Sequence, residues 1–176
     1  PRVVARRAAW RAVGAATALE HNSIDRVAIL DFDVHHGNGT VDIFKNNPSV
    51  LVASSFQHPY YPNRYYDIER SNIVNTPLKA GTKGSEFRKA IERDWLPALG
   101  KFKPQLIFIS AGFDAHTDDP LGDIHLREDD FQWVTELIVS SAKEHCEGKV
   151  ISTLEGGYNL DALARSVSAH LQALSD

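Results

Sequence analysis

The sequence predicts an α/β fold in which helices cover both faces of a parallel sheet. Four short apolar runs alternate along the chain with amphipathic segments whose apolar residues recur every three or four positions. Such alternation builds strand–helix–strand units, and the strands of these units run parallel. The chain has 176 residues, 43% of them hydrophobic, so we expect one domain over residues 1–176 with its own core.

Each expected element follows from a local pattern. An alanine-rich segment from about residue 2 to residue 20 has helical spacing, and the polar residues 21–23 end it. The expected buried strands are the apolar runs at 27–30, 50–53, 106–109 and 150–154. Three stripes predict helices that face the core: Phe87, Ile91, Trp95 and Ala98; Phe131, Val134, Ile138 and Ala142; Leu160, Leu163, Val167, Leu171 and Leu174. Residues 56–84 are expected to form loops over one end of the sheet.

Composition narrows the range of partners and compartments. The formal net charge of -4 and the pI near 6.1 disfavour nucleic acid as a partner. No apolar run approaches the roughly 18 residues of a membrane span, and the amino end lacks the apolar core of a secretory signal. Cys146 is the only cysteine and has no partner for an internal disulfide, so we expect a cytoplasmic location. Because the chain lacks methionine, we expect it to belong to a longer reading frame.

Unusual polar residues follow the apolar runs, where the strands are expected to end. Asp31, Asp33 and His35 are spaced by two, so their side chains project to the same side as the first strand ends. The third run leads into Asp114, and the fourth leads into Gly-Gly-Tyr158. Ligands of open α/β sheets bind beyond the carboxyl ends of the strands. We therefore expect these side chains to meet at one rim of the sheet.

Asp33, His35 and Asp114 form the expected metal site. Alone, an Asp-x-His pair beside glycines is more often a turn former or a helix cap. Three strands that all deliver polar side chains to one rim make coincidence a poor explanation. Two carboxylates and one imidazole suit a borderline divalent metal such as zinc and leave a position open for water. A metal of this kind activates water, and the Tyr158 phenol can donate to the oxyanion, which indicates hydrolysis of an amide.

Three ordered motifs resemble a known family. The segments DFDVHHGNGT at 31–40, SAGFDAH at 110–116 followed by DDPLG, and LEGGYN at 154–159 are similar to the histone deacetylase superfamily, in its class II and bacterial acetylpolyamine-amidohydrolase-like branch. The resemblance runs from about residue 24 to residue 174. It implies the arginase-like three-layer fold, a central parallel sheet between helices, here incomplete on its amino-terminal side.

The resemblance also implies roles for individual residues. Asp33, His35 and Asp114 would bind one zinc ion, and Tyr158 would stabilise the transition state. Asp31 would orient a catalytic histidine, and Asn38 would lie behind the ligands. Two potassium positions are implied, the first formed by Asp31, Asp33, His35, Ser54 and Ser55 and the second by backbone oxygens of Phe44 and Val50. The substrate tunnel would be formed by Tyr61, Leu121 and Gly157.

The sequence departs from the family pattern in one respect. Family members carry two adjacent histidines, a general base and a general acid, upstream of the first motif, whereas the only adjacent pair here is His35-His36 of the metal motif. We expect His58, His116 and His125 to be solvated or hydrogen-bonded rather than catalytic. The sequence thus indicates the metal-binding carboxy-terminal portion of a zinc-dependent deacetylase that acts on acetyl-lysine or acetylated polyamines.

Two alternatives to this deacetylase remain open. One is a non-catalytic metal-binding remnant that keeps the fold, and the other is an arginase-like hydrolase with two manganese ions. The second alternative needs more bridging aspartates than the sequence offers. A chain without its upstream segment would expose apolar surface, so a homo-oligomer is compatible with the sequence.

Overall fold

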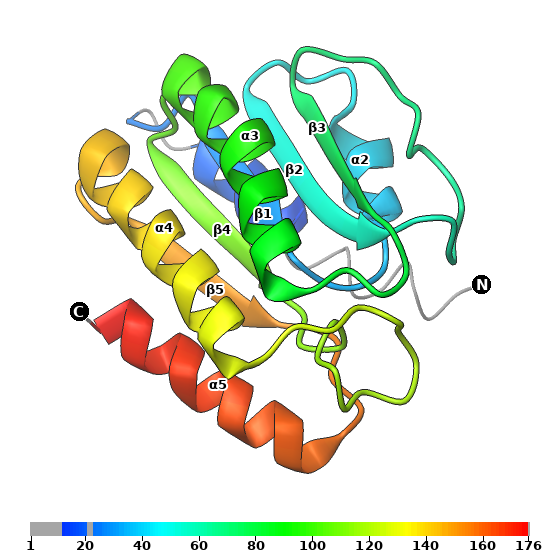
Figure 1. Ribbon diagram of the computed structural model, residues 1–176. Helices are drawn as coiled ribbons and strands as arrows, with labels where there is room; N and C mark the ends of the chain where they lie inside the picture. The colour runs from blue at the N-terminus through cyan, green and yellow to red at the C-terminus, as the bar shows by residue number, and fades with distance from the viewer. Residues whose placement is uncertain (1–11, 21–22, 176) are drawn as a thin grey trace.

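The computed structural model describes residues 12–20 and 23–175, which are built around one five-stranded sheet (Figure 1). Neighbouring strands pair in parallel in the order β3-β2-β1-β4-β5. Residues 12–20 are helical, and the other elements are β1 (Val27–Asp31), α2 (Asn38–Phe44), β2 (Val50–Gln57), β3 (Ile73–Leu78), α3 (Gly84–Phe102), β4 (Leu106–Ala111), α4 (Glu128–Cys146), β5 (Val150–Leu154) and α5 (Leu160–Ser175). The predicted parallel α/β fold is confirmed. The amino-terminal part of the predicted first helix lies outside the described residues.

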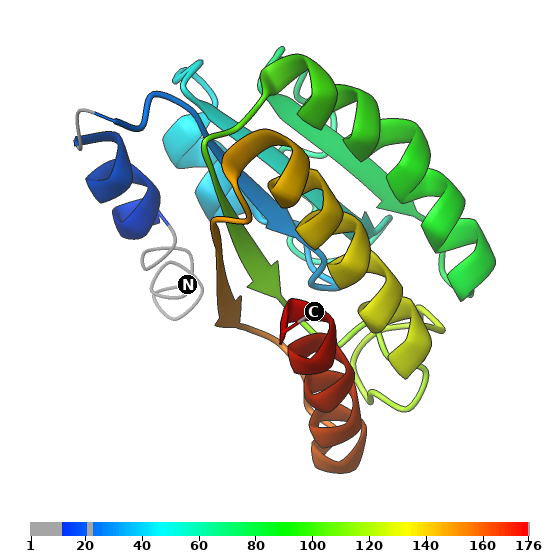
Figure 2. The same ribbon diagram turned by 90° about the vertical axis from the view of Figure 1, so that its left-hand side faces the viewer.

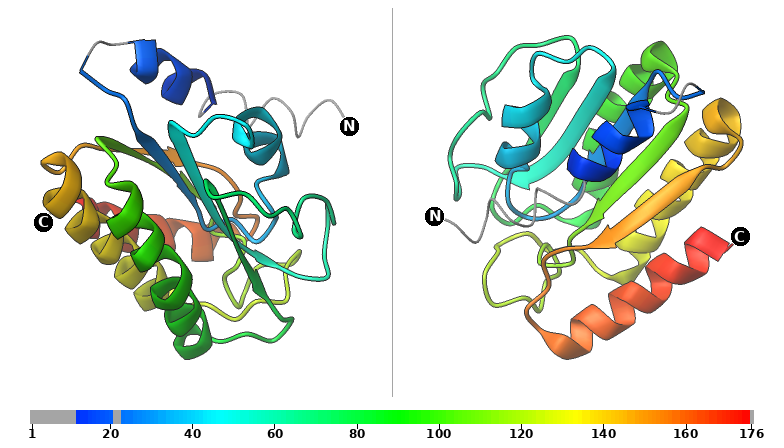
Figure 3. Two further views of the ribbon diagram at one scale, coloured as in Figure 1. Left: turned by 90° about the horizontal axis from the view of Figure 1, so that it is seen from above. Right: turned by 180° about the vertical axis from the view of Figure 1, so that it is seen from behind.

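Helices lie on both faces of the sheet. α3, α4 and α5 lie on one face, and α2 and the helix at 12–20 lie on the other (Figure 2, Figure 3). In β1, Ala28 and Leu30 join the core that includes α3 and α4, whereas Val27 and Ile29 pack with α2 and residues 12–20. Burial of both faces explains why the central strands are continuous apolar runs. None of the described helices combines the length and the apolar character that a membrane span needs.

The sequence pattern misses two elements. α2 lies where the pattern predicts a glycine-rich turn, and its seven residues are too few to show an amphipathic repeat. β3 lies inside the predicted loop region and contains Asn75 and Pro77, residue types that disfavour strands. Because β3 is an outer strand, a proline is tolerated there. Tertiary pairing with β2 therefore decides the conformation of this segment.

The other edge of the sheet is more exposed than its sequence predicts. β5 is the outer strand, and Ile151 and Leu154 are both exposed. Leu160 and Leu171 of the last predicted stripe are 77% and 55% exposed, so the prediction that they face the core is wrong. α5 instead buries a narrow row of small residues and one histidine: Ala162, Ser166, His170 and Ala173. Small side chains let this helix approach α4 closely, which turns the two leucines outward.

His170 joins three elements inside the protein. Its Nδ1 lies 2.7 Å from Oγ1 of Thr135 in α4, and its Nε2 lies 2.8 Å from Oγ of Ser152 in β5. The Thr135 hydroxyl donates to the Phe131 carbonyl, so it accepts from Nδ1–H, and Nε2 accepts from Ser152. Burial lowers the pKa of His170 from 6.5 to about 4. The folded protein therefore holds this ring in its neutral form.

We expect His170 to make the fold sensitive to mild acid. The unfolded chain protonates this ring near pH 6.5, whereas the folded chain does so only near pH 4, so the stabilisation is complete above pH 6.5 and is lost as the pH falls towards 4. From pH 7.5 to pH 5 the loss in free energy of unfolding from this group is about 2 kcal/mol. Urea denaturation at the two pH values measures the loss. A His170→Gln variant should lose less over the same interval, and equal losses would contradict the assignment.

Candidate metal centre

The three predicted ligands meet at the carboxyl end of the sheet. Asp33 and His35 follow β1, and Asp114 follows β4, which is the neighbouring strand. After β1 the chain continues to β2 on one side, and after β4 it continues to β5 on the other side. The ligands thus lie at the switch point of the sheet, where open α/β sheets bind their ligands. One ligand atom from each of the three residues lies within 4.8 Å of the other two.

The imidazole of His35 lies between the two carboxylates. Its Nδ1 is 2.9 Å from Oδ1 of Asp33 and 3.2 Å from Oδ2 of Asp114. Asp114 is fully buried, and its Oδ1 accepts a hydrogen bond from the Val34 amide at 2.9 Å. Its Oδ2 receives no well-directed hydrogen bond from the described residues, although the ring of His35 lies beside it. Burial of a carboxylate oxygen without a well-directed hydrogen bond costs free energy unless a cation lies beside it. The two carboxylates and the imidazole therefore fit a divalent metal.

The electrostatics of the cluster favour an added positive charge. Burial and the negative charge of Asp33 raise the pKa of Asp114 to about 6. Burial alone would lower the pKa of His35, but the carboxylates of Asp114 and Asp33 beside its Nδ1 outweigh this effect and raise the pKa to about 10. The cluster thus holds a proton tightly in the absence of other cations. A metal ion that displaced this proton would satisfy both carboxylates and the ring nitrogen.

Two glycines allow the loops to approach the ligands. The Gly156 amide donates to Oδ2 of Asp33 at 3.1 Å, and a Cβ at this position would lie 2.0 Å from Oδ2 of Asp114. A Cβ at Gly112 would lie 2.5 Å from the Cα of Asp33. Any side chain at either position would push a ligand away, so the close approach requires glycine.

Asp31 lies directly behind the ligand loop. Its Oδ1 accepts a hydrogen bond from the Asp33 amide at 3.1 Å. Its register partner in β2 is Ser54, whose Oγ accepts from the Gly37 amide at 3.3 Å. Three residues of the first implied potassium position, Asp31, Ser54 and Ser55, are thus buried in two paired strands. Asn38 begins α2 beside them, and its amide donates to the His36 carbonyl at 2.7 Å.

The second implied potassium position has a different geometry. The carbonyl oxygens of Phe44 and Val50 lie 2.8 Å and 2.9 Å from Nδ2 of Asn72. An ion bound between these two carbonyls would occupy the place of that nitrogen. An ion at this point would therefore compete with the Asn72 side chain for the same two carbonyls.

The predicted tunnel residues lie around an open rim. Tyr61, Leu121 and Tyr158 are exposed. Tyr61 meets His35 edge-on, with 6.2 Å between ring centres, while Tyr60 stacks on His35 at 5.3 Å. The Tyr60 hydroxyl also donates to the Leu121 carbonyl. No sequence pattern singles out Tyr60, because two adjacent tyrosines in an irregular loop give no periodic signal that separates them.

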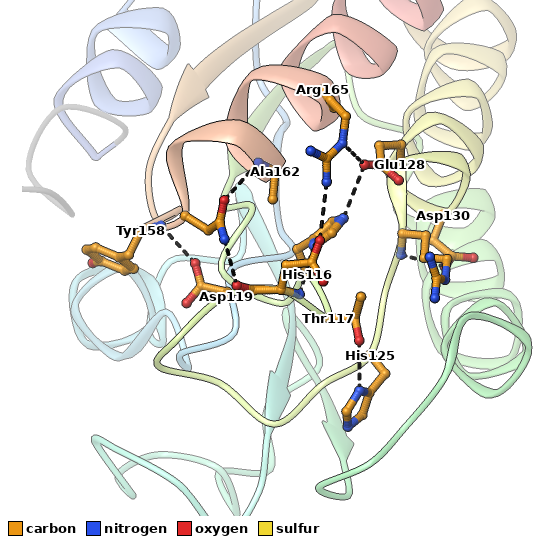
Figure 4. Close-up of polar contacts among 12 residues, drawn as sticks. His116, Thr117, Asp119, His125, Glu128, Asp130, Tyr158, Ala162 and Arg165 are labelled. Atoms are coloured by element: carbon orange, nitrogen blue, oxygen red, sulfur yellow. Dashed lines mark hydrogen bonds and ion pairs between the residues drawn. The ribbon is translucent and has the colours of Figure 1, made fainter.

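The loop that carries Tyr158 is fastened to the loop at 117–122 (Figure 4). The Tyr158 amide donates to Oδ2 of Asp119 at 2.7 Å, and Oδ1 of the same carboxylate accepts from the Leu121 amide at 3.0 Å. Gly157 has a φ of 140°, a conformation that side chains rarely adopt, which explains a glycine before the tyrosine. Asp119 thus fixes the positions of two rim residues at once.

The Asn159 side chain makes a second hydrogen-bonded contact between the same two loops. Its Nδ2 donates to the Asp118 carbonyl at 3.0 Å, and its Oδ1 accepts from the Ala162 amide at 3.0 Å (Figure 4). The side chain therefore caps the first turn of α5. The entry of the chain into α5 is held in place directly after Tyr158.

Most of the other described histidines are engaged away from the ligands. The partners are the side-chain amide oxygen of Asn75 for His36, the Tyr66 ring for His58, the backbone amide of Asp118 for His116, the Thr117 hydroxyl for His125, and the Thr135 and Ser152 hydroxyls for His170. His36 is buried, and its ring meets the Phe56 ring edge-on with 4.5 Å between ring centres. These rings are held by structural contacts rather than directed at the metal centre.

Comparison with known proteins identifies the family. The histone deacetylase domain matches residues 10–174. The chain belongs to the histone deacetylase family. It is 38% identical to the type-2 histone deacetylase 2 of Dictyostelium discoideum over 93% of this chain and 10% of that protein. It is 37% identical to a histone deacetylase-like amidohydrolase of Pseudomonas aeruginosa over 84% of this chain and 41% of that protein.

A solved structure shows the same fold. The histone deacetylase Clr3 matches with a TM-score of 0.85 at 33% identity, covering 93% of this chain and 29% of Clr3. The predicted family and the arginase-like fold of histone deacetylases are thereby confirmed. This deacetylase-family chain spans less than half the length of each of the three relatives named here.

We expect replacement of any one of the three ligands to remove most of the bound metal while the chain stays folded. The purified chain should hold about one divalent ion, and Asp33→Ala, His35→Ala and Asp114→Ala should each lose most of it, because the remaining two ligands bind weakly. Mass spectrometry of metal content after dialysis measures this. His125→Ala is the matched control, since that ring is engaged with Thr117. Full metal content in all three ligand variants would contradict the site.

We expect Asp119→Asn to loosen the Tyr158 loop. An asparagine side chain offers one acceptor oxygen, so it keeps only one of the two amide bonds made by the carboxylate. Hydrogen exchange at the Tyr158 or Leu121 amide should become roughly tenfold faster, with metal content unchanged. Asp118→Asn, an exposed neighbour in the same loop, is the control. Unaltered exchange at both amides in the Asp119 variant would refute this role.

Proposed function

We propose that this chain forms the metal-binding portion of a zinc-dependent deacetylase, which removes acetyl groups from acetyl-lysine or acetylated polyamine-type amides. The observation that carries this proposal is the convergence of Asp33, His35 and Asp114 at the switch point of the sheet in a histone deacetylase family chain. Zinc is preferred because two carboxylates and one imidazole give a three-ligand set with an open position. One ion per chain follows from the single cluster of this kind among the described residues.

The residues at the rim have separate tasks in this reaction. Asp33, His35 and Asp114 would hold zinc, which supplies activation of water and polarisation of the acetyl carbonyl. The Tyr158 phenol donates a hydrogen bond to the oxyanion, and Asp119 holds its loop in position. Tyr60 and Tyr61 flank His35 and present aromatic surface to the aliphatic part of an acyl-lysine side chain.

The described residues provide no evident general base or general acid for the proton transfers of this reaction. His36, His58, His116, His125 and His170 are engaged with other partners, as described above. The carboxylate of Asp31 is occupied by the Asp33 amide and suits the orientation of another group rather than proton transfer to substrate. The family resemblance implies that two adjacent histidines supply the base and the acid. A non-catalytic metal-binding role is the alternative function, and the open rim and the engaged histidines favour it for the chain by itself.

The test compares turnover of a fluorogenic acetyl-lysine peptide by three proteins: the 176-residue chain, the full-length gene product and its Tyr158→Phe variant. The chain alone should be slower than the full-length product by roughly 10²- to 10⁴-fold, the contribution of general acid–base catalysis. Tyr158→Phe should lower kcat by roughly 10²- to 10³-fold with zinc content unchanged, the loss expected for one oxyanion donor.

A Tyr66→Phe variant controls for loss of a phenol elsewhere on the surface. Zinc-dependent turnover by the chain alone at the full-length rate would show that a residue assigned here to structure, such as His58 or His116, serves as the base. An unchanged rate for Tyr158→Phe would place the phenol outside the mechanism.

A further inference from the structure

Three backbone carbonyls converge on one side-chain nitrogen inside the protein. Nδ2 of Asn72 is 2.8 Å from the carbonyl oxygen of Phe44, 3.0 Å from that of Asn47 and 2.9 Å from that of Val50. Asn72 is 7% exposed, so water competes little for these contacts. We call the three oxygens the carbonyl cage.

The carbonyl cage lies where three elements meet. Phe44 is the last residue of α2, Asn47 is in the following turn, and Val50 is the first residue of β2. The last carbonyls of a helix have no partner within the helix and need one from outside. The Asn47 amide donates to the Phe44 carbonyl, and the Val50 amide donates to the Asn47 carbonyl, so Asn72 meets their remaining lone pairs.

Asn72 also belongs to the sheet through its backbone. Its carbonyl accepts a hydrogen bond from the Val52 amide at 2.9 Å, directly before β3 begins. One residue thus connects the end of α2, the start of β2 and the start of β3. The amide must present its nitrogen to the cage, because the amide oxygen would be repelled by three carbonyl oxygens.

Several carbonyl oxygens directed at one point form the arrangement that replaces the hydration shell of a potassium ion in proteins. An amide nitrogen carries partial positive charge and two hydrogens, so it makes two directed hydrogen bonds and one further electrostatic contact. We propose that the Asn72 side chain takes the place of a monovalent cation in the carbonyl cage, so that this position needs no ion. This proposal is independent of the deacetylase activity proposed above.

The presence of the Asn72 side chain in the carbonyl cage, in place of an ion, has a consequence for the metal centre. α2 begins at Asn38, three residues after His35, so the cage anchors the far end of the helix that follows the ligand loop. A covalently attached amide is not lost when the potassium concentration falls. The position of α2 behind the ligands is therefore insensitive to potassium at this cage, whatever the first implied potassium position contributes.

The test compares thermal unfolding of the wild type, Asn72→Ala and Asn72→Leu in potassium chloride and in choline chloride at equal ionic strength. Asn72→Ala opens the cage, so its Tm should fall by roughly 3–6 °C in choline and recover most of this loss in potassium. Asn72→Leu fills the space without a donor, so its Tm should fall in both salts without extra recovery. All three proteins retain the residues of the first implied potassium position. Any effect of potassium on Tm through that position is therefore the same in each protein and cancels in the comparison.

If Asn72 were only an ordinary turn-stabilising residue, potassium would rescue the alanine variant no more than the leucine variant, and that result would overturn the proposal. Anomalous scattering from wild-type crystals grown in rubidium chloride provides a second measurement that needs no variant. We expect no rubidium among the carbonyls of Phe44, Asn47 and Val50. A rubidium peak there in the wild type would overturn the proposal even if both variants fail to fold.

Discussion

The close approach of Asp33 and Asp114 is the constraint on which the rest of the site depends. Two carboxylates beside each other in a buried position repel, and the raised pKa of Asp114 reflects burial and this repulsion. The fold maintains the approach through the paired strands β1 and β4 and through Gly112 and Gly156, which leave no room for a side chain against the ligands. His35 between the carboxylates partly offsets the repulsion, and a divalent ion would offset it further.

The sheet holds Asp33, His35 and Asp114 in well-defined positions because its central strands are buried on both faces. Asp31 is in register with Ser54 of β2 and Ser110 of β4, so polar side chains lie next to one another in three strands whose preceding residues are apolar. A slip of one residue would turn the ligands into the core and the core residues outward. The hydrophobic pattern of β1 therefore fixes the positions of Asp33 and His35 as well as the stability of the fold.

The ligands and the central strands were predictable because their signals are local: two-residue spacing after an apolar run, and glycines beside it. β3 was not, since Asn75 and Pro77 oppose a strand and only its pairing with β2 overrides them. Leu160 and Leu171 follow a helical stripe, but packing of small residues against α4 turns them outward. The roles of Tyr60, Asp119 and Asn72 depend on contacts between residues distant in sequence, which no spacing rule reveals.

X-ray absorption at the zinc edge of the zinc-loaded chain shows which atoms surround the ion and so tests whether Asp33, His35 and Asp114 bind it. We expect a first shell of nitrogen and oxygen alone at about 2.0–2.2 Å, with the outer-shell signal of a single imidazole from His35. Sulfur at about 2.3 Å, which only Cys146 can supply, or the signal of two or more imidazoles, would contradict it.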